Sequence, residues 1–283
     1  MQKLGVIGLG RMGSAIAERL AGQGVNVTGW TRSGLGSAGA AKLGIARAET
    51  LADLAAGSDI LITSLYDDIA VGEVLDTLAT LPLTGKLIID TSTIAPSTLT
   101  SRADALKADL VDAPIAGGPE MVLAGSCSLL LGGAPEAAAR ALPILKMISD
   151  RAVLVGPLGA GLVMKCINNG IMQTYFAGLF EQVKIAKRAG LDLEIVLQIL
   201  CSGPVALPAV IARLPKILGE DTTVGFPVSG ALKDNEVFHR IAEDLGVPVP
   251  ALGAARAMGQ YGVANGLAEM DPAGLIAHAY HSA

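Results

Sequence analysis

Charged and aromatic side chains are scarce in this sequence. Among its 283 residues, 17% are charged and 3% are aromatic, whereas 51% are hydrophobic. Globular domains usually carry about 25% charged residues. A surface so poor in charge favours a subunit interface that buries part of it. Richness in alanine is the simpler alternative, and the composition leaves both explanations open.

Cysteine and histidine are also rare, and both are widely spread. The cysteines form no Cys-x-x-Cys pair, so the sequence indicates neither a disulfide framework nor a zinc site. A reducing compartment is the simpler environment for them. The histidines do not have the spacing of metal ligands, and we predict no bound metal. These residues are Cys127, Cys166, Cys201, His239, His278 and His281.

A basic stripe and a long apolar run are missing too. The formal net charge is −5, which gives no support for nucleic-acid binding. The longest uncharged stretch, residues 195–212, contains Gln198, Ser202 and two prolines, which a lipid-facing helix disfavours. Residues 1–3 lead directly into an apolar run and glycines, with no cleavage site. We therefore expect no membrane span, no targeting segment and a cytoplasmic location.

The first half of the chain contains a regular alternation of short β-rich runs and amphipathic stretches. The runs are nearly continuous in apolar residues, as in strands covered on both faces. Alternating strands and helices predict βαβ units and a mostly parallel sheet. The expected strands are Leu4–Ile7, Val25–Trp30, Asp59–Thr63, Lys86–Asp90, Asp109–Asp112, Ser128–Leu131 and Ala152–Val155. The expected helices between them include Ser14–Leu20, Thr50–Ala56 and Pro135–Ser149.

After about Gly161 the pattern changes to helices. Residues 162–188 contain no proline and no convincing strand, which predicts one long helix. Further helices are expected at Leu191–Cys201, Ala206–Leu218, Lys233–Leu245, Leu252–Asn265 and Pro272–Tyr280. We therefore predict an α/β domain at residues 1–160. An all-α domain at residues 161–283 is expected to begin with the long interdomain helix.

A glycine motif opens the α/β domain. Gly8-Leu9-Gly10-Arg11-Met12-Gly13 fits G-x-G-x-x-G between a strand and a helix, the context of a Rossmann-like dinucleotide-binding domain. The first glycine permits a tight turn, the second lets a pyrophosphate approach the backbone, and the third brings helix and strand together. The N–H groups and the dipole of the helix N-terminus then attract phosphate. A glycine-rich turn that binds nothing is the alternative.

The end of the second strand bears on which dinucleotide binds. A site selective for NAD usually has Asp or Glu about 20 residues after the glycines, but here the strand ends in Trp30-Thr31-Arg32-Ser33. The planar Arg32 guanidinium suits a ribose 2′-phosphate, and the hydroxyls of Thr31 and Ser33 add donors. The segment predicts NADP, with a solvated Arg32 and loose selectivity as the alternative.

Four further blocks complete a resemblance that covers essentially the whole chain. Together with residues 5–13, in the same order and spacing, they resemble the β-hydroxyacid dehydrogenase family, which includes 3-hydroxyisobutyrate dehydrogenase and several semialdehyde reductases. The blocks are Asp90-Thr91-Ser92-Thr93-Ile94, Asp112–Gly118, Gly156–Gly161 with Lys165 and Asn168-Asn169, and Lys233-Asp234. The resemblance implies an NADP-dependent oxidoreductase that moves a hydride between the nicotinamide and a small 3-hydroxy acid or its semialdehyde. It also implies a dimer or tetramer formed through the helical half.

The resemblance assigns catalysis to Lys165. This residue lies in the apolar stretch 163–167, where loss of hydration lowers a lysine pKa and lets it act as general acid/base. A lysine that reaches out to solvent is the alternative. Asn169 lies four residues on, on the same helix face, where it would fix Lys165 or hold the substrate. Asn168 points elsewhere.

The substrate is expected to meet Ser92 and the backbone N–H groups of Gly117 and Gly118. For Ser92, helix capping is the alternative role. Ala116 stands where the family usually has serine, and Leu123 where many relatives have glutamate. Both differences favour a more apolar pocket and put the substrate, rather than the chemistry, in doubt.

Lys233 is expected to reach the substrate or the cofactor from the helical half, with Asp234 orienting it. The pair follows an expected turn at Ser229-Gly230, and a surface ion pair is the alternative. The other expected cofactor contacts follow strands of the sheet. They are Leu65, Tyr66, Thr91 and Thr93.

Three hypotheses for the function stay open. The first is an NADP-dependent 3-hydroxyacid dehydrogenase that reduces small semialdehydes. The second is an imine reductase or reductive aminase of the same architecture, which Ala116 and the apolar loop favour but which the presence of Lys165 disfavours. The third is a protein that binds NADP without catalysis. The helical half is too short for the 6-phosphogluconate dehydrogenase branch.

Overall fold

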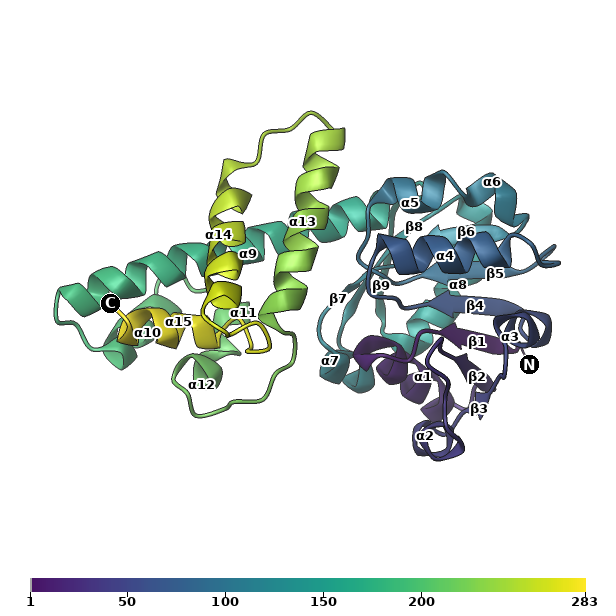
Figure 1. Ribbon diagram of the computed structural model, residues 1–283, viewed down its shortest axis with the longest axis horizontal. Helices are drawn as coiled ribbons and strands as arrows, with labels where there is room; N and C mark the ends of the chain where they lie inside the picture. The colour runs from purple at the N-terminus through teal and green to yellow at the C-terminus, as the bar shows by residue number, and fades with distance from the viewer. Residues whose placement is uncertain (1) are drawn as a thin grey trace. The chain divides into compact units, whose positions relative to one another are not determined.

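A computed structural model describes residues 2–283. The chain divides into two compact units, one ending at Cys166 and the other running from Ile167 to Ala283. The first is a sheet covered by helices, and the second contains helices only (Figure 1), which confirms the predicted fold class. Helix α9 (Ala160–Arg188) spans the division without a break. The domain boundary at residue 160 therefore stays a prediction.

Within the described residues, the first unit has a nine-stranded sheet in the order β3-β2-β1-β4-β5-β6-β8-β7, with β9 paired to β8. Strands β1 to β6 are parallel. Strand β8 runs antiparallel to β6 and β7, and β9 is parallel to β8. The strands are β1 (Leu4–Ile7), β2 (Val27–Trp30), β3 (Ala46–Arg47), β4 (Ile60–Thr63), β5 (Leu87–Asp90), β6 (Asp109–Asp112), β7 (Ile115–Ala116), β8 (Ser128–Gly132) and β9 (Arg151–Gly156).

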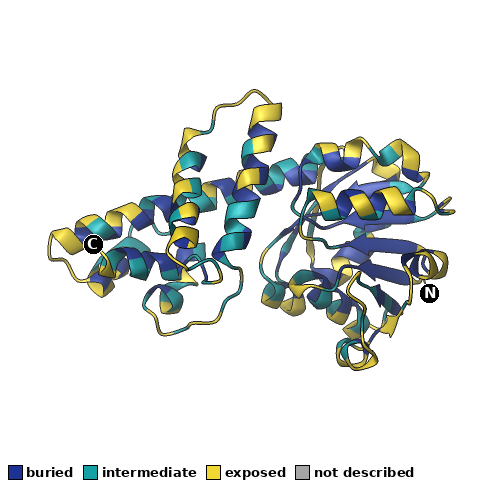
Figure 2. Cartoon of the chain, viewed as in Figure 1, coloured by how far each residue is buried: buried dark blue, intermediate teal, exposed yellow. Residues whose placement is uncertain are grey.

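Helices cover both faces of this sheet, so the inner strands β1, β4 and β5 are buried along their whole length (Figure 2). One face packs against Ile16 and Leu145 of α1 and α8, and the other against Leu54 and Leu75 of α3 and α4. The helices are α1 (Arg11–Gly22), α2 (Ser37–Leu43), α3 (Leu51–Gly57), α4 (Asp68–Leu78), α5 (Pro96–Thr100), α6 (Ala103–Leu106), α7 (Pro119–Ala124) and α8 (Pro135–Ile148). Burial on both faces explains the continuous apolar runs of the sequence.

The strand order reverses between β1 and β4, because β2 and β3 lie on one side of β1 while β4, β5 and β6 lie on the other. In open parallel sheets, ligands bind at the carboxyl ends of the strands at such a point. Gly8 follows β1, Leu65 comes after β4, Ser92 after β5 and Ala113 after β6. Four segments that are far apart in the sequence thus meet at one edge of the sheet.

The second unit packs the later part of α9 with six further helices around Phe180, Leu197 and Met258. These helices are α10 (Leu193–Ser202), α11 (Pro208–Ile211), α12 (Leu214–Ile217), α13 (Val228–Asp244), α14 (Pro250–Ala264) and α15 (Gly274–His281). None of the helices within residues 2–283 is long and apolar enough to span a bilayer.

Two sequence predictions in this unit are wrong. The single helix expected at Ala206–Leu218 is instead α11 and α12, because Pro215 lacks an N–H group and cannot continue the preceding helix. The turn expected at Ser229-Gly230 lies inside α13, which begins at Val228. Gly230 is needed there for packing rather than for a turn, since a Cβ on it would lie 2.8 Å from the Phe226 ring.

Candidate active site

The glycine loop after β1 has the geometry that its sequence predicts. Gly8 has φ +90°, and a Cβ on Gly13 would collide with the Gly8 carbonyl oxygen. Gly10 is the N-cap of α1, and a Cβ on it would meet nothing within 4 Å. Two of the glycines therefore let the strand, the turn and the helix pack together, while Gly10 faces open space. A backbone left open at a helix N-terminus fits a pyrophosphate group.

The loop after β2 presents Arg32 to solvent. Its side chain is 81% exposed, and Nη1 lies 2.9 Å from Glu73 Oε2 of α4. Ser33 is also exposed, whereas Thr31 is half-buried and its carbonyl accepts a hydrogen bond from the Gly34 N–H. An exposed pair of this kind holds Arg32 only weakly, so the guanidinium can exchange Glu73 for another anion.

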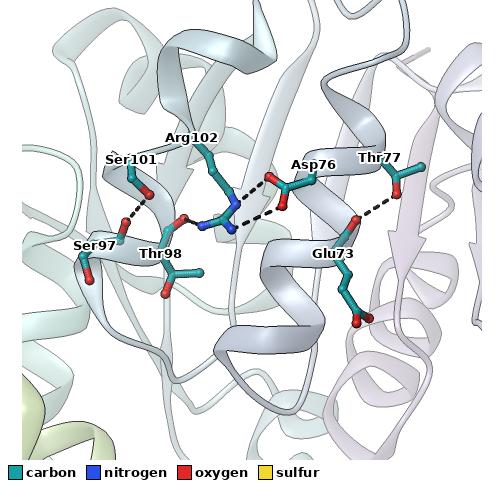
Figure 3. A network of polar contacts seen from close by, with 7 residues as sticks. All are labelled: Glu73, Asp76, Thr77, Ser97, Thr98, Ser101 and Arg102. Carbon is teal, nitrogen blue, oxygen red and sulfur yellow. Dashed lines mark hydrogen bonds and ion pairs between the residues drawn. The ribbon is translucent and has the colours of Figure 1, made fainter.

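Helix α4 is itself fixed to the segment that follows β5. Arg102 donates to both carboxylate oxygens of Asp76, at 2.7 and 3.2 Å, and to the Thr98 carbonyl of α5 (Figure 3). Asp68 at the start of α4 accepts from the Ala95 N–H and from the Thr98 hydroxyl. These contacts hold α5 and the residues before it against the α4 surface.

A buried network centred on Asp90 links the ends of β4 and β5. One oxygen of Asp90 accepts from the hydroxyls of Thr63 (2.5 Å) and Ser92 (3.1 Å), and the other accepts from the Ser92 N–H (3.0 Å). The Ser92 hydroxyl in turn accepts from the Leu65 N–H at 3.0 Å. Burial raises the Asp90 pKa to about 6, against the lowering effect of these hydrogen bonds, and the nearby Asp112 raises it further.

The other polar candidates near this network differ in exposure. Ser92 does not cap α5, whose N-cap is Ala95, so the capping alternative is wrong. The buried Thr91 hydroxyl donates to the Thr63 carbonyl at 2.8 Å and thus braces the sheet. Thr93 is half-buried and Tyr66 is 62% exposed. Contact of these residues with a cofactor stays a prediction.

The loop after β7 requires glycine at its first position. Gly117 has φ +146°, and a Cβ on it would lie 3.1 Å from the Cys127 Cβ. Gly118 is the N-cap of α7, and the carboxylate of the exposed Glu120 folds back over it, with Oε2 2.6 Å from the position of a Cβ. Glu120 places a negative charge beside a loop that Ala116 was expected to make more apolar. The sequence analysis assigned no role to Glu120.

Lys165 lies in the first turns of α9 and is only 6% exposed. Its Nζ donates a hydrogen bond to the carbonyl oxygen of Ile115, just before the Gly117-Gly118 loop. The alternative of a lysine that reaches out to solvent is therefore wrong. The structure places the ammonium group beside the loop that the sequence analysis expected to hold substrate.

The start of α9 is held by Asp112, a residue that sequence reasoning quoted in a motif but gave no role. The Asp112 carboxylate accepts from the N–H groups of Gly159 (2.6 Å) and Leu162 (2.9 Å). Burial raises its pKa, and the backbone N–H groups act in the opposite direction. The available signal was its position, since Asp90 and Asp112 both end parallel strands at the same sheet edge.

The remaining candidates lie in the helical unit. Asn169 is half-buried, and its side-chain oxygen accepts from the Asn168 amide at 2.8 Å. Lys233 Nζ lies 2.6 Å from Asp234 Oδ1 on α13, and the Asp234 side chain is 7% exposed. This pair is therefore no surface ion pair. Gln173 of α9 donates to the Ala231 carbonyl, so α13 is attached to α9 just before Lys233.

Residues 2–283 contain no group of three or more His, Cys, Asp or Glu side chains that could hold a metal ion. None of the cysteines within residues 2–283 forms a disulfide; Cys127 is buried, and Cys166 and Cys201 are partly buried.

Two family models together match nearly the whole chain. Residues 3–156 match the NAD binding domain of 6-phosphogluconate dehydrogenase, and residues 159–279 match the NAD-binding domain of NADP-dependent 3-hydroxyisobutyrate dehydrogenase. These matches, and the glycine loop described above, support a nicotinamide dinucleotide as the cofactor.

Similarity to individual proteins supports the same family. The chain is 30% identical to 3-hydroxyisobutyrate dehydrogenase of Pseudomonas aeruginosa, over 71% of this chain and 69% of that one. It is 28% identical to 2-hydroxy-3-oxopropionate reductase of Escherichia coli, over 97% and 96%. A structure of Mycobacterium tuberculosis 3-hydroxyisobutyrate dehydrogenase with L-serine has the same fold, with a TM-score of 0.88, 24% identity and 98% of each chain covered. Imine reductases and a reductive aminase share the fold at TM-scores of 0.60 to 0.66.

Proposed function

The chain belongs to the β-hydroxyacid dehydrogenase family, and from this premise we propose that it is an NADP-dependent 3-hydroxyacid dehydrogenase acting as a reductase of small semialdehydes. The observation that carries the proposal is the buried Lys165, whose Nζ donates to the Ile115 carbonyl beside the Gly117-Gly118 loop. A general acid must stand within hydrogen-bond reach of the oxygen that it protonates, and a substrate in this loop would meet that condition.

The residues of the first unit have distinct roles in this reaction. The glycine loop at Gly8, Gly10 and Gly13 would hold the pyrophosphate, and the bound nicotinamide supplies or accepts the hydride. Lys165 Nζ donates a proton to the carbonyl oxygen of the semialdehyde as the hydride reaches the carbonyl carbon. In the direction of oxidation, Lys165 accepts the hydroxyl proton of the 3-hydroxy acid.

Ser92 and the loop N–H groups position the substrate in this proposal. The Ser92 hydroxyl is held between Asp90 and the Leu65 N–H, so its place at the sheet edge is fixed before a substrate arrives. Gly117 and Gly118 offer N–H groups to the substrate carboxylate. Asn169 and Lys233, with Asp234 orienting Lys233, are further proposed contacts with the substrate or the cofactor.

NADP rather than NAD is the proposed cofactor because no carboxylate follows β2. Arg32 stands at that position, and its exposed guanidinium forms an ion pair with the exposed Glu73. A ribose 2′-phosphate carries more charge than one carboxylate and suits the planar fork of arginine. Leu65, Tyr66, Thr91 and Thr93 lie along the same sheet edge and complete the proposed cofactor contacts.

Imine reduction is the second candidate, and Glu120 is the observation that favours it. Its carboxylate lies over Gly118, where it would repel the carboxylate of a semialdehyde acid and attract an iminium cation. The buried Lys165 favours the first candidate, because an iminium ion needs no proton on an oxygen. It also argues against a protein that only binds NADP, since burial of a lysine is costly without a role.

We also propose that the protein forms a homodimer or homotetramer through the helical unit and is located in the cytoplasm. Ile195 and Ile199 lie one turn apart on α10, and their side chains are 58% and 64% exposed. Ile185 of α9 is 61% exposed. Exposed apolar side chains on these two helices favour a partner surface, which light scattering of the purified protein would test.

The first test is oxidation of NADPH by the purified protein against a panel of carbonyl compounds. The panel contains glyoxylate, succinic semialdehyde, tartronate semialdehyde, methylmalonate semialdehyde and a cyclic imine, each also tried with NADH. The variants are Lys165→Ala and, as a matched control, Lys146→Ala on the exposed surface of α8. We expect turnover of an acid aldehyde with NADPH that falls about 10²- to 10⁴-fold in Lys165→Ala and is unchanged in Lys146→Ala. Turnover of the imine alone, with full activity in Lys165→Ala, would overturn the proposal in favour of imine reduction.

A further inference from the structure

The segment from the end of β6 to the start of β7, residues 112–115, contacts helix α9 at two successive points. Asp112, the last residue of β6, accepts from the N–H groups of Gly159 and Leu162 at the start of the helix. Ile115, just beyond it, accepts from Lys165 Nζ. Leu162 and Lys165 are three residues apart and share one helix face. One short segment thus holds both the beginning of α9 and its lysine.

The Asp112 carboxylate satisfies N–H groups that a helix leaves without a partner. The first N–H groups of a helix have no carbonyl acceptor within the helix. Gly159 directly precedes α9, and Leu162 lies in its first turn. A single carboxylate has two acceptor oxygens, and each of them serves one of these donors. The positive end of the helix dipole favours a negative charge here.

The Asp112 carboxylate fits in place because glycines surround it. A Cβ on Gly132 at the end of β8 would collide with Asp112 Oδ1, and a Cβ on Gly161 would lie 2.7 Å from Oδ2 and collide with the Leu130 carbonyl. Gly159 has φ +92°, a conformation that other residues rarely adopt. Strand β8, the turn before α9 and the first helical turn therefore all close onto Asp112, and the helix start cannot shift while the carboxylate is in place.

From this geometry we propose that Asp112 is a positioning residue, which sets the place of Lys165 relative to the Gly117-Gly118 loop by fixing the start of α9. The inference rests on the proposed role of Lys165 in proton transfer. Asp112 touches no reacting atom in this scheme and acts only through the helix. A fixed helix start keeps Lys165 Nζ on the Ile115 carbonyl, within reach of a substrate oxygen at the loop.

The decisive variant is Asp112→Asn, because the amide keeps the shape of the side chain but has only one acceptor oxygen. One of the two N–H groups then faces an NH₂ group, and the helix start loosens. Asp271→Asn is the matched control. Asp271 is a buried carboxylate whose two oxygens accept from the Gly225 and Ala273 N–H groups of the helical unit. It loses the same hydrogen-bond chemistry but has no link to the start of α9.

The first measurement needs no substrate. Trace labelling of lysines with acetic anhydride, followed by mass spectrometry, reports the reactivity of Lys165 against that of Lys86 and Lys146 in the same sample. We expect Lys165 to react about fivefold faster in Asp112→Asn, the effect of losing one helix-cap hydrogen bond, and at the wild-type rate in Asp271→Asn. Unchanged labelling of Lys165 in Asp112→Asn, or an equal change in Asp271→Asn, overturns the inference.

The second measurement uses whichever acid aldehyde of the panel the wild-type protein turns over fastest. In Asp112→Asn we expect kcat to fall about 10- to 100-fold, as for a misplacement of roughly 1 Å in a catalytic group. The pH at which kcat changes should shift, while the dissociation constant of NADPH stays at the wild-type value. A role in stability alone would leave the pH profile unchanged. Full activity in Lys165→Ala would overturn the proposed function, whereas a wild-type pH profile in Asp112→Asn would overturn only the positioning role.

A measurement on the wild-type protein covers the case in which Asp112→Asn does not fold. Amide hydrogen exchange of Gly159 and Leu162 should be as slow as that of the buried strand β5, because both N–H groups donate to a buried carboxylate. Exchange at the rate of exposed loop amides would show that the two hydrogen bonds are not maintained, and it would overturn the inference.

Discussion

The hydroxyl of Ser92 accepts a hydrogen bond from the backbone N–H of Leu65 at 3.0 Å. This contact joins the segment after β5 to the segment after β4, where a substrate residue and a cofactor residue are expected. The same hydroxyl donates to Asp90, so one side chain connects the proposed ligand contacts to a buried carboxylate. Its removal therefore has consequences for both stability and binding.

Ser92→Ala should leave the Leu65 N–H without its acceptor and Asp90 without one donor. We expect a loss of about 1–3 kcal/mol in the free energy of unfolding, measured by urea denaturation, together with a higher KM for the aldehyde. Ser101→Ala is the control, because its exposed hydroxyl donates to the carbonyl of the exposed Ser97, and surface changes cost at most about 0.5 kcal/mol. Equal losses in the two variants would contradict the bridging role of Ser92.

The pKa of Asp90 predicts a pH dependence of stability. Burial raises this pKa from 3.8 to about 6, so the folded state binds a proton more tightly than the unfolded state does. The stabilising contribution is complete below the unfolded pKa and is lost as the pH rises through the folded pKa. Asp90→Asn cannot ionise, so it should gain stability relative to the wild type as the pH rises from about 4 to 6, between the unfolded and folded pKa values, towards about 3 kcal/mol at 1.36 kcal/mol per pKa unit.

Urea denaturation at several values from about pH 4 to 7 measures this difference. The control is Asp221→Asn, because hydrogen bonds from Thr223 and Lys216 lower the Asp221 pKa to about 2. The stability contribution of that group changes only at more acidic pH, so its difference from the wild type should be constant over the range. A constant difference for Asp90→Asn as well would disprove the prediction.

Two glycines of one loop should respond differently to the same substitution. Gly13→Ala places a Cβ against the Gly8 carbonyl oxygen, whereas Gly10→Ala places it in open space. We expect Gly13→Ala to destabilise the fold by about 1–3 kcal/mol through overpacking. The free energy of unfolding of Gly10→Ala should stay within about 0.5 kcal/mol of the wild-type value. The variant should bind NADPH at least about tenfold more weakly, because its methyl group occupies the space of the pyrophosphate.

Thermal denaturation without cofactor and NADPH fluorescence titration separate these two effects. If Gly10→Ala bound NADPH with wild-type affinity, the pyrophosphate would not approach Gly10 and the cofactor placement would be wrong.

Arg32 should determine the preference between NADP and NAD. Arg32→Ala is expected to lower kcat/KM with NADPH by about 10- to 100-fold, as for loss of a charge-assisted phosphate contact, and to leave kcat/KM with NADH nearly unchanged. Glu73→Gln is the control, because it removes the ion pair of Arg32 but keeps the guanidinium. A parallel fall with both cofactors would instead assign Arg32 a structural role.

The strands and the glycine loop could be predicted because their signals are local. An apolar run of four residues between turn residues specifies a buried strand wherever it pairs, and all seven expected strands are present in the described structure. Helix ends were harder to predict. Helix α13 begins at Val228, but Gly230 in its first turn predicts a loop from the sequence. The glycine is there because the Phe226 ring packs against it, which only the tertiary structure shows.

The substrate loop was only partly predictable. The need for glycine at Gly117 follows from its φ of +146° and from the Cys127 side chain beside it, and the sequence motif already marked the position. The Glu120 carboxylate over Gly118 was missed, because nothing in the local sequence shows that an exposed side chain in the first turn of α7 folds back over the N-cap. Its effect depends on where the first turn of α7 directs the side chain.

The sequence by itself determined the alternation of strands and helices, the glycine loop and the types of residue at the site, because each depends on spacing along the chain. The tertiary structure alone decided which of them work together. Thr63 meets Asp90 across 27 residues, Asp112 meets Gly159 across 47, and Lys165 meets Ile115 across 50. The order of the strands in the sheet decides which residues distant in the sequence become neighbours, and no local pattern encodes that order. A buried carboxylate or lysine can therefore be recognised in the sequence, but its hydrogen-bond partner, and with it its role, follows from the packing of the sheet.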